Sequence, residues 1–556
     1  MGIKKNFLYS SVLTTAGYIF PLITFPYVSR VLGVANIGIC NFVDCIVGYF
    51  VLFAMLGIQN TGIRETARCQ GNKAELSRTF FSILGLNAVL VALSGTLLVI
   101  CIEAVPRLAA YRPLMYIGVG KLVAAFAMID WLYRGLEDFR YITIRSIAVR
   151  CLYVVAVFVF IRKPEDYPVY FALTVATEGL NALVNCIHAR KYLRFLALFP
   201  TQASEPSPDF RFSIFKYLKS CLTLGSYSLL TSMYTSFNIA FLGFVTDTTE
   251  VGLYSTATKL HQMAIGFLLA FTGVMLPRMS NLVSEGRERE FREKIRVSFS
   301  MLVWFSFPLI ILGAVFAPEI IAIISGAGYE KAAIPLTIIM PLVFIIGVEQ
   351  ILVVQILMAQ KRDGIVLRNA VIGAAVGLTA NLLLVKSMGC VGSALAWVAS
   401  EVSVMIAALI AARGWFPLRE AMRKTLKNVL YAIPAVAACI AIRQLDGVPV
   451  RAMIIAGVVV AAYYVCLHLF VIKDKYLMSI VKRSEKGSEK GSEKGSERGS
   501  EGDDSSSSSS VQEGDDSSSS SSVQEGDDSS SSSSVQEGDV PFTSLSLPLH
   551  SPFTPK

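Results

Sequence analysis

Residues 11–44 read SVLTTAGYIFPLITFPYVSRVLGVANIGICNFVD, and Arg30 and Asp44 are the only charged residues among them. A helix needs about 20 consecutive apolar residues to cross the hydrocarbon core of a bilayer, and the run at 7–29 has that length. This run is too long for the apolar core of a signal peptide, contains two prolines and lacks a small-residue cleavage site. We therefore expect it to remain in the protein as a transmembrane helix.

Comparable apolar runs continue through most of the 556 residues. The chain is 54% apolar and 16% charged with a mean hydropathy of +0.57, whereas about a quarter of the residues of a soluble domain are charged. This composition argues against a soluble globular enzyme and predicts an all-α integral membrane protein with about 14 transmembrane helices. An alternative is twelve spans plus a re-entrant pair. The runs lie near 7–29, 38–60, 79–103, 112–132, 142–161, 168–188, 216–241, 254–276, 296–317, 333–358, 366–385, 390–412, 426–444 and 452–472.

Lysine and arginine are concentrated in alternate loops between these runs. If the N-terminus is cytoplasmic, the inner segments hold 33 of the 50 lysines and arginines and the outer loops hold 9. Basic loops stay on the cytoplasmic side of a membrane. We therefore expect both termini and the basic loops at 190–219 and 278–296 to be cytoplasmic.

The body contains pairs of equivalent positions that lie six predicted helices apart. DFRYITIRSIAV and KRDGIVLRNAVI each open a helix after a short basic loop, and one arginine in each precedes a glutamate by 33 residues. LGVANIGICNF and VTDTTEVGLYS each place a glycine after a polar turn. The paired positions are Arg145 with Arg368, Glu178 with Glu401, and Gly38 with Gly252. Such repeats insert in the same orientation, which predicts two six-helix lobes related by a pseudo-two-fold axis along the membrane normal, plus two extra helices.

Residues 484–556 differ from the body in composition. They hold 5 basic and 15 acidic residues and contain three tandem copies of GDDSSSSSSVQE. Such a sequence has almost nothing to bury, so we expect a low-complexity, disordered tail that serves as a linker or as a docking or phosphorylated segment. The predicted divisions are 1–212 for the first lobe with its cytoplasmic linker, 213–415 for the second lobe, 416–483 for helices 13 and 14, and 484–556 for the tail.

The 10 cysteines and 4 histidines are scattered singly, without a CxxC motif or a histidine cluster. The sequence therefore predicts no structural zinc, no iron–sulfur cluster, no disulfide framework and no cofactor. The polar chemistry of the body must come from the few ionisable residues inside the apolar runs.

We single out eight ionisable residues inside the predicted spans. Each costs about 2.5 to 3.5 kcal/mol to insert, so such residues usually face a cavity or a partner rather than lipid. They occur in both halves and at several depths, which favours a polar pathway through the bundle over isolated structural pairs. The inserted residues are Asp44, Lys121, Asp130, Arg150, Glu178, Lys259, Glu349 and Glu401, and the rim residues are Arg30, Arg145 and Arg368.

Three segments resemble the Wzx-type oligosaccharide flippases, the polysaccharide-biosynthesis branch of the superfamily that includes the MATE exporters. They are SVLTTAGYIFPLITFPYVSRVLGVANIGICNFVD (11–44), LFAMLGIQNTGIRETAR (52–68) and DWLYRGLEDFRYITIRS (130–146). The resemblance covers about residues 1–480. It implies a transporter and not an enzyme. Such proteins move undecaprenyl-diphosphate-linked oligosaccharide repeat units from the cytoplasmic to the periplasmic leaflet of the bacterial inner membrane by alternating access, for surface polysaccharide of the O-antigen or capsule type.

The resemblance also implies how the charged residues are used. The basic candidates would bind the diphosphate by charge-assisted hydrogen bonds, and the acidic candidates would serve coupling or gating. The cations are Arg30, Lys121, Arg145, Arg150, Lys259 and Arg368, and the carboxylates are Asp44, Asp130, Glu178, Glu349 and Glu401. We further expect Glu178 and Glu401 to face each other across the pathway, each neutralised by an arginine on a neighbouring span until substrate binds.

The implied partners are the lipid-linked oligosaccharide, membrane lipid and a polysaccharide polymerase machinery, with no nucleic acid. Lipid II flippases of the same superfamily carry an arginine inside the first helix. This chain has none between Lys5 and Arg30, which argues against a peptidoglycan precursor as the substrate. The glycan is expected to be neutral or weakly acidic.

Two other function classes stay open. A MATE-like cation-coupled exporter of small molecules needs mid-depth carboxylates without competing arginines, so neutralising Arg150 should help export and damage flipping. An intramembrane polysaccharide polymerase needs a sizeable outer loop for its chemistry, and the longest outer loop runs only from about Ala317 to Ala332.

The predicted orientation can be tested by cysteine labelling of intact cells, on a background without the native cysteines. Cysteine placed at Ser204 or Ser284 should react with a membrane-impermeant maleimide only after the cells are opened, because both loops are expected to be cytoplasmic. Strong labelling of either position in intact cells would invert the proposed topology.

Overall fold

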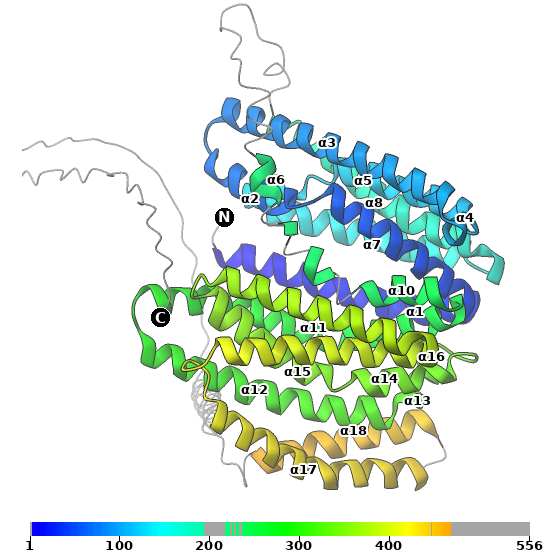
Figure 1. Ribbon diagram of the computed structural model, residues 1–556, viewed down its shortest axis with the longest axis vertical. Coiled ribbons are helices and arrows are strands. Elements are labelled where there is room, and N and C mark those ends of the chain that lie inside the picture. The colour runs from blue at the N-terminus through cyan, green and yellow to red at the C-terminus, as the bar shows by residue number, and fades with distance from the viewer. Residues whose placement is uncertain are drawn as a thin grey trace, which may run out of the picture. The chain divides into compact units, whose positions relative to one another are not determined.

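The computed structural model describes residues 3–193, 217–222, 225–226, 229–232, 236–445 and 448–468, all within one compact unit that ends at Val481. Throughout these ranges the chain forms helices, turns and short connections without a β-strand (Figure 1). The expected all-α fold is confirmed. Most of the 190–219 loop and the predicted tail at 484–556 lie outside the described residues.

The helices that precede residue 193 form what we call the first lobe. They are α1 (Ile3–Ala54), α2 (Ile58–Arg68), α3 (Lys73–Ala104), α4 (Pro106–Ala109), α5 (Arg112–Ala127), α6 (Asp130–Gly135), α7 (Phe139–Phe160), η1 (Pro164–Asp166) and α8 (Tyr167–Ala189). Within this lobe α1 packs against α3, α5 and α7, and α8 packs against α5 and α7.

The helices from α10 to α16 form the second lobe. They are α10 (Phe237–Val245), α11 (Thr248–Ser284), α12 (Glu288–Val315), α13 (Ala317–Ile324), η3 (Glu330–Ala332), α14 (Ala333–Ile339), α15 (Leu342–Gln350), the π-helix η4 (Ile351–Met358) and α16 (Asp363–Ala411). The last two helices, α17 (Leu418–Leu445) and α18 (Pro449–Cys466), pack on α12. The exact lobe boundaries at 212 and 415 stay predictions.

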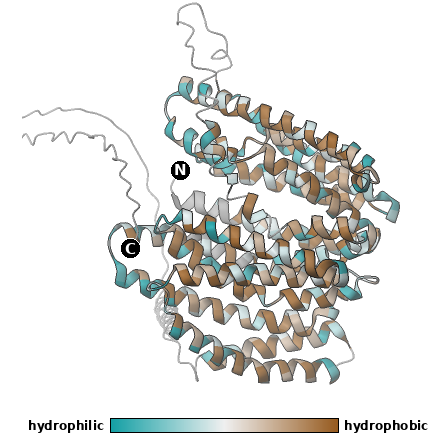
Figure 2. Cartoon of the chain, viewed as in Figure 1, coloured by the Kyte–Doolittle hydropathy of each residue, from teal (hydrophilic) through white to brown (hydrophobic). Residues whose placement is uncertain are grey.

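The helices have the surface of a membrane protein. Nine helical ranges within the described residues are long and apolar enough to cross a membrane. Figure 2 shows hydrophobic residues along the helix shafts and hydrophilic residues mostly at the helix ends. Leu93, Leu383 and Leu426 are 67%, 71% and 72% exposed, which is unfavourable in water and favourable against lipid chains. The chain is therefore a multi-pass membrane protein, and the exact number of fourteen spans stays a prediction.

Two of the long helices contain a break at a glycine. Gly33 in α1 has a φ of 75°, and Gly389 in α16 has a φ of 55°. These values lie in the left-handed region, which glycine adopts without the steric cost that a side chain brings. Each break falls between two predicted apolar runs. The helices α1 and α16 therefore each contain two successive runs.

The segment around Cys221, which follows the first lobe in the chain, packs back on that lobe. Cys221 is fully buried in a cluster that includes Ile58 and Trp131. Nearby, Nη2 of Arg64 donates a hydrogen bond of 2.8 Å to Oγ of Ser220. The seventh apolar run therefore begins against α2 before α10 joins the second lobe.

The two lobes meet where α1 crosses α11, at the pair of glycines that the sequence placed in equivalent positions. A Cβ atom on Gly38 would lie 2.7 Å from the carbonyl carbon of Thr248 and 2.9 Å from N of Gly252. A Cβ atom on Gly252 would lie 3.0 Å from the carbonyl carbon of Val34. Each glycine thus faces the residue four positions before the other, which is the reciprocity that a pseudo-two-fold axis produces. Small residues allow this close approach of two helices in a membrane.

This crossing predicts a stability loss from the smallest possible side chain. Gly38→Ala forces two backbones apart, and overpacking of this kind costs about 1 to 3 kcal/mol. We expect a lower melting temperature of the detergent-solubilised protein, read by size-exclusion chromatography after heating. The matched control is Gly85→Ala on α3, because nothing lies within 4 Å of a Cβ at that position. Equal melting temperatures for the two variants would show that the crossing is not tightly packed.

Candidate functional site

Three of the predicted charged residues meet in the first lobe. Nζ of Lys121 on α5 lies 2.5 Å from Oδ1 of Asp44 on α1 and 3.0 Å from Oε1 of Glu178 on α8. The lysine side chain is 10% exposed, whereas those of Asp44 and Glu178 are 50% and 39% exposed. One buried cation therefore holds two carboxylates that remain accessible, and the cluster has a formal charge of −1.

Asp44 opens onto a cavity of about 390 Å³ between the lobes, which we call the interlobe cavity. Its walls come from the second half of α1, from Ser232, Ser236 and Ile239, and from α11. Most of its side chains carry hydroxyl, amide or charged groups, which is unusual in the middle of apolar helices. The polar lining residues are Asn41, Asp44, Tyr49, Ser232, Ser236, Ser255, Thr258, Lys259 and Gln262.

Lys259 supplies the positive charge of the interlobe cavity. Its Nζ donates a hydrogen bond of 3.0 Å to Oδ1 of Asn41 and lies 5.0 Å from the centre of the Phe25 ring. Nδ2 of Asn41 donates a hydrogen bond of 2.8 Å to Oγ of Ser255, which fixes the orientation of the amide. Within the described parts of the chain no carboxylate forms an ion pair with Lys259, so its charge is available to a ligand.

Arg150 is a second cation without a carboxylate partner. It lies on α7 and faces α1, where its Nη1 would be 3.5 Å from a Cβ on Gly17. This nitrogen is buried and has no hydrogen-bond partner among the described residues. The absence of a side chain at Gly17 leaves room for the guanidinium beside α1.

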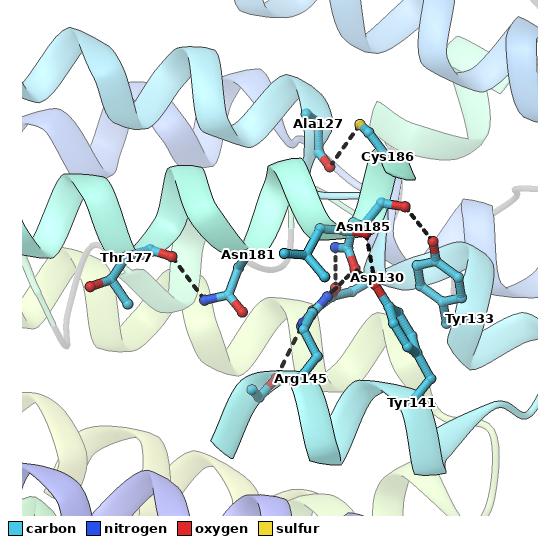
Figure 3. A network of polar contacts seen from close by, with 11 residues as sticks. Ala127, Asp130, Tyr133, Tyr141, Arg145, Thr177, Asn181, Asn185 and Cys186 are labelled. Carbon is cyan, nitrogen blue, oxygen red and sulfur yellow. Dashed lines mark hydrogen bonds and ion pairs between the residues drawn. The ribbon is translucent and has the colours of Figure 1, made fainter. Parts of the chain in front are cut away.

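Arg145 is held differently from Arg150, although the two lie on the same helix. Its Nη1 donates a hydrogen bond of 2.8 Å to Oδ1 of Asp130 and another to Oδ1 of Asn185. Nδ2 of Asn185 donates a hydrogen bond of 2.7 Å to the same Asp130 oxygen. Figure 3 shows the arginine reaching from α7 toward α8 into this network. The network neutralises Arg145 and joins α6, α7 and α8, and it does not line the interlobe cavity.

Glu349 and Glu401 lie inside the second lobe, with 7% and 3% of their surface exposed. Nε1 of Trp397 donates a hydrogen bond of 2.9 Å to Oε1 of Glu401. Neither carboxylate lines the interlobe cavity. The prediction that an arginine neutralises each of Glu178 and Glu401 is wrong. Lys121 forms the ion pair with Glu178, and Trp397 donates the hydrogen bond to Glu401.

The two remaining cations lie at opposite ends of the bundle. Arg30 donates a hydrogen bond to the carbonyl of Ile323, and the hydroxyl of Tyr329 donates one of 3.2 Å to the carbonyl of Ser29. These bonds join α1 to α13 and to the segment that follows it, and so link the two lobes at this end. Arg368 is exposed near the start of α16, without an ion pair to any residue that the structure describes.

Sequence reasoning missed three residues that shape the site. Nε of Arg107 on α4 donates a hydrogen bond of 2.9 Å to the carbonyl of Gly243, a second link between the lobes at the end that holds Arg30. Asn41 orients Lys259, and the hydroxyl of Tyr49 donates a hydrogen bond of 3.0 Å to the carbonyl of Ser232. Asn41 and Asp44 are three residues apart, and this spacing places both on one face of a helix. The sequence therefore contained a signal that could have identified Asn41.

The first half of the chain matches a known protein family. Residues 3–283 match the family described as polysaccharide biosynthesis protein. The chain is 24% identical over 365 residues to an Escherichia coli (strain K12) protein named "Putative O-antigen transporter", which is 65% of this chain and 85% of that protein. It is 25% identical over 205 residues to "Probable low-salt glycan biosynthesis flippase Agl15" of Haloferax volcanii, which is 36% of this chain and 42% of that protein.

Solved structures share the fold at low sequence identity. The lipid II flippase MurJ in an inward closed conformation superimposes with a TM-score of 0.67 and 13% identity over 84% of this chain and 99% of that chain. A MATE family multidrug resistance transporter in an inward-facing conformation has a TM-score of 0.52 and 15% identity over 73% of this chain and 95% of that chain. At these identities the likeness shows the fold alone.

The contrast between Arg145 and Arg150 predicts different outcomes for the same substitution. Arg145→Gln leaves the half-buried carboxylate of Asp130 without its cation, and breaking a buried ion pair costs about 3 to 5 kcal/mol. We expect a clear fall in the amount of folded protein in the membrane. Arg150→Gln removes a charge without a partner and should leave that amount unchanged. Quantitative blotting of membranes checks both, and equal levels of the two variants would contradict the difference in pairing.

Proposed function

The chain belongs to the polysaccharide biosynthesis protein family, and we propose that it moves lipid-linked oligosaccharide from one leaflet of its membrane to the other. The observation that carries this proposal is the interlobe cavity, a polar space between two lobes that contains a lysine without an ion pair to any described residue. A flippase needs such a space because sugar hydroxyls and phosphates cannot cross hydrocarbon without polar partners.

The lining of the interlobe cavity suits both parts of the ligand headgroup. Hydroxyl and amide groups such as those of Ser255, Thr258 and Gln262 can exchange hydrogen bonds with sugar hydroxyls. Lys259 can donate charge-assisted hydrogen bonds to a phosphate oxygen. Arg150, which lies on α7 and faces α1 at Gly17, is the second cation that we assign to the diphosphate.

The cluster of Lys121, Asp44 and Glu178 gives the substrate a means to influence conformation. A phosphate that approaches Lys121 competes with the two carboxylates for the same ammonium group. Their release leaves two negative charges, which favour a different arrangement of α1, α5 and α8. Substrate binding then shifts the balance between conformations because the two arrangements bind the phosphate with different affinity.

Alternating access requires the two lobes to separate at the end of the bundle where Arg30 and Arg107 link them. The bonds of Arg30 and Arg107 to backbone carbonyls of the second lobe are few and exposed or only half buried, so they can open without disrupting either lobe. The glycine crossing of α1 and α11 lies close to these bonds in the chain and is the natural axis for the movement. Transport of this kind requires no catalytic group.

Finer features of the function are part of the proposal. The lipid carrier would be undecaprenyl diphosphate, the product a surface polysaccharide of the O-antigen or capsule type, and the location a bacterial inner membrane with both termini cytoplasmic. A polysaccharide polymerase would receive the flipped unit. The names of the Escherichia coli and Haloferax volcanii relatives support glycan transport, and the excess of basic inner loops supports the orientation.

Cation-coupled export of small molecules is the second candidate. The accessible carboxylates of Asp44 and Glu178 favour it, because a cationic substrate would need them. The positive charges of Lys259 in the interlobe cavity and of Arg150 beside α1 oppose it. An exporter would gain from their removal, whereas a flippase would lose.

Lys259→Gln tests the proposed function in a flippase-null strain that depends on the plasmid-borne chain for glycan display. We expect normal membrane abundance and a roughly tenfold to hundredfold loss of surface glycan, since a hydrogen bond to a charged group contributes about 1.5 to 3 kcal/mol. The matched control is Lys386→Gln on α16, an exposed lysine outside the cavity. Full display with Lys259→Gln would remove the cavity from the transport path.

A further inference from the structure

A second hollow lies away from the interlobe cavity, between α7 and α8. Its volume is about 600 Å³, and it shares no lining residue with the interlobe cavity. We call it the α7–α8 groove. Its lining residues are Asp138, Arg140, Tyr141, Ile144, Arg145, Ala148, Val149, Val184, His188 and Lys191.

One side of the α7–α8 groove continues into a face of α7 that has the character of a lipid contact. Ile144, Leu152 and Val155 are 55%, 56% and 59% exposed and recur at helical spacing. A helix face that is exposed and wholly apolar along a membrane span faces acyl chains. Leu183 and Ile187 give α8 a similar exposed edge. The groove is therefore open to the bilayer and not to the space between the lobes.

The other side of the groove carries two exposed cations. Arg140 lies in the first turn of α7, and Lys191 lies just after the last turn of α8. Neither forms an ion pair with any residue in the described ranges, although Nζ of Lys191 lies 5.5 Å from the centre of the Tyr192 ring. The chain direction places both at the end of the lobe that holds the basic loops.

Asp138 is the acidic residue of the groove and is engaged by the protein. Its Oδ1 accepts a hydrogen bond of 3.2 Å from the backbone N of Tyr141, and its Oδ2 accepts one of 2.8 Å from the hydroxyl of Tyr192. Arg145 is neutralised by Asp130. Arg140 and Lys191 contribute two positive charges, and Asp138 contributes one negative charge. With Arg145 counted as neutralised by Asp130, the groove has a formal charge of +1.

The aromatic residues make the groove rigid. The rings of Tyr141 and His188 are stacked with centroids 3.8 Å apart and an angle of 8° between their planes. The hydroxyl of Tyr141 donates a hydrogen bond of 3.0 Å to the carbonyl of Val184 on α8 (Figure 3). Stacked tyrosine and histidine rings at the end of a span belong to the headgroup region of a membrane, where one edge is apolar and the other is wet.

We propose that the α7–α8 groove binds an anionic glycerophospholipid from the leaflet at the basic end of the bundle. The phosphodiester lies between Arg140 and Lys191, and an acyl chain follows Ile144 and Ala148 along α7. Basic pockets between transmembrane helices on the cytoplasmic side bind lipid headgroups in this way. The single negative charge of a phosphodiester matches the +1 charge of the groove, whereas a polyprenyl diphosphate would leave an excess of negative charge. This site does not depend on the proposed transport function.

A bound lipid would also support the first lobe from outside. Arg145 lines the groove, and its Nη1 holds Asp130 and Asn185. An anion in the groove therefore stabilises the charge at the centre of the network that joins α6, α7 and α8. The lipid is expected to raise the melting temperature of the whole chain.

The test uses the purified full chain in detergent, titrated with phosphatidylglycerol, with phosphatidylcholine and with inorganic phosphate. Bound lipid is counted by native mass spectrometry, and the melting temperature is measured in parallel. We expect one phosphatidylglycerol to bind at least tenfold more tightly than phosphatidylcholine and to raise the melting temperature. The combined substitution Arg140→Gln and Lys191→Gln should weaken its binding roughly thirtyfold, the product expected for two surface cations.

Two further variants separate a defined site from general attraction to a basic surface. Arg134→Gln with Arg190→Gln removes two exposed cations at the same end that do not line the groove, and should leave phosphatidylglycerol binding unchanged. Ala148→Trp keeps every charge but fills the groove at an exposed position, and should abolish the preference. Equal binding of the two lipids to the unmodified chain, equal loss in the Arg134 and Arg190 control, or full competition by inorganic phosphate would each overturn the proposal.

Discussion

The close contact between α1 and α11 at Gly38 and Gly252 is the constraint on which the rest of the site depends. Because neither residue has a side chain, the two backbones touch, and the residues that follow on each helix are brought face to face. Three positions after each glycine, Asn41 and Ser255 share a hydrogen bond. Seven positions after Gly252, Lys259 reaches Asn41. The interlobe cavity is lined by the residues that follow Gly38 on α1 and Gly252 on α11. The tight crossing therefore positions the side chains that line this cavity.

Charge neutralisation divides the ionisable residues of the membrane region into two classes. Arg145 and Asp130 form an ion pair within one lobe, with Asn185 bonded to both, and the burial of Arg145 argues for a structural role. Lys259 and Arg150 lack carboxylate partners among the described residues. Lys259 lines the space between the lobes, and Arg150 faces α1 at Gly17. The cluster of Lys121, Asp44 and Glu178 is intermediate, since its lysine is buried and its carboxylates are accessible. The presence or absence of an ion-pair partner, and not depth in the membrane, separates these classes.

The sequence predicted the helices better than it predicted their contacts. The apolar run at 142–161 corresponds closely to α7, because length and hydropathy alone decide whether a helix can lie in a bilayer. The run at 296–317 underestimates α12, which begins at Glu288, because the first turns of α12 are polar and are held by ion pairs such as that of Arg292 with Glu288, which hydropathy ignores. Lys121 was identified as an inserted charge, but its partners were not, since Asp44 is 77 positions away and only the packing of α1 against α5 brings the two together. Arg107 could not be identified because its acceptors are backbone carbonyls, which leave no pattern in the sequence.

Translocation by the purified chain is the most direct test of the claim that the space between the lobes carries lipid-linked glycan. The full chain is reconstituted in liposomes that contain a polyprenyl-diphosphate-linked oligosaccharide with a fluorescent label on the sugar, and an impermeant reductant is added outside. Without protein, only the label in the outer leaflet should be lost. With the chain present, nearly all of the label should be lost as inner-leaflet lipid reaches the outer surface, and a labelled phosphatidylcholine in the same liposomes should keep its protected half. Protection of the glycan label equal to that in protein-free liposomes would contradict the claim.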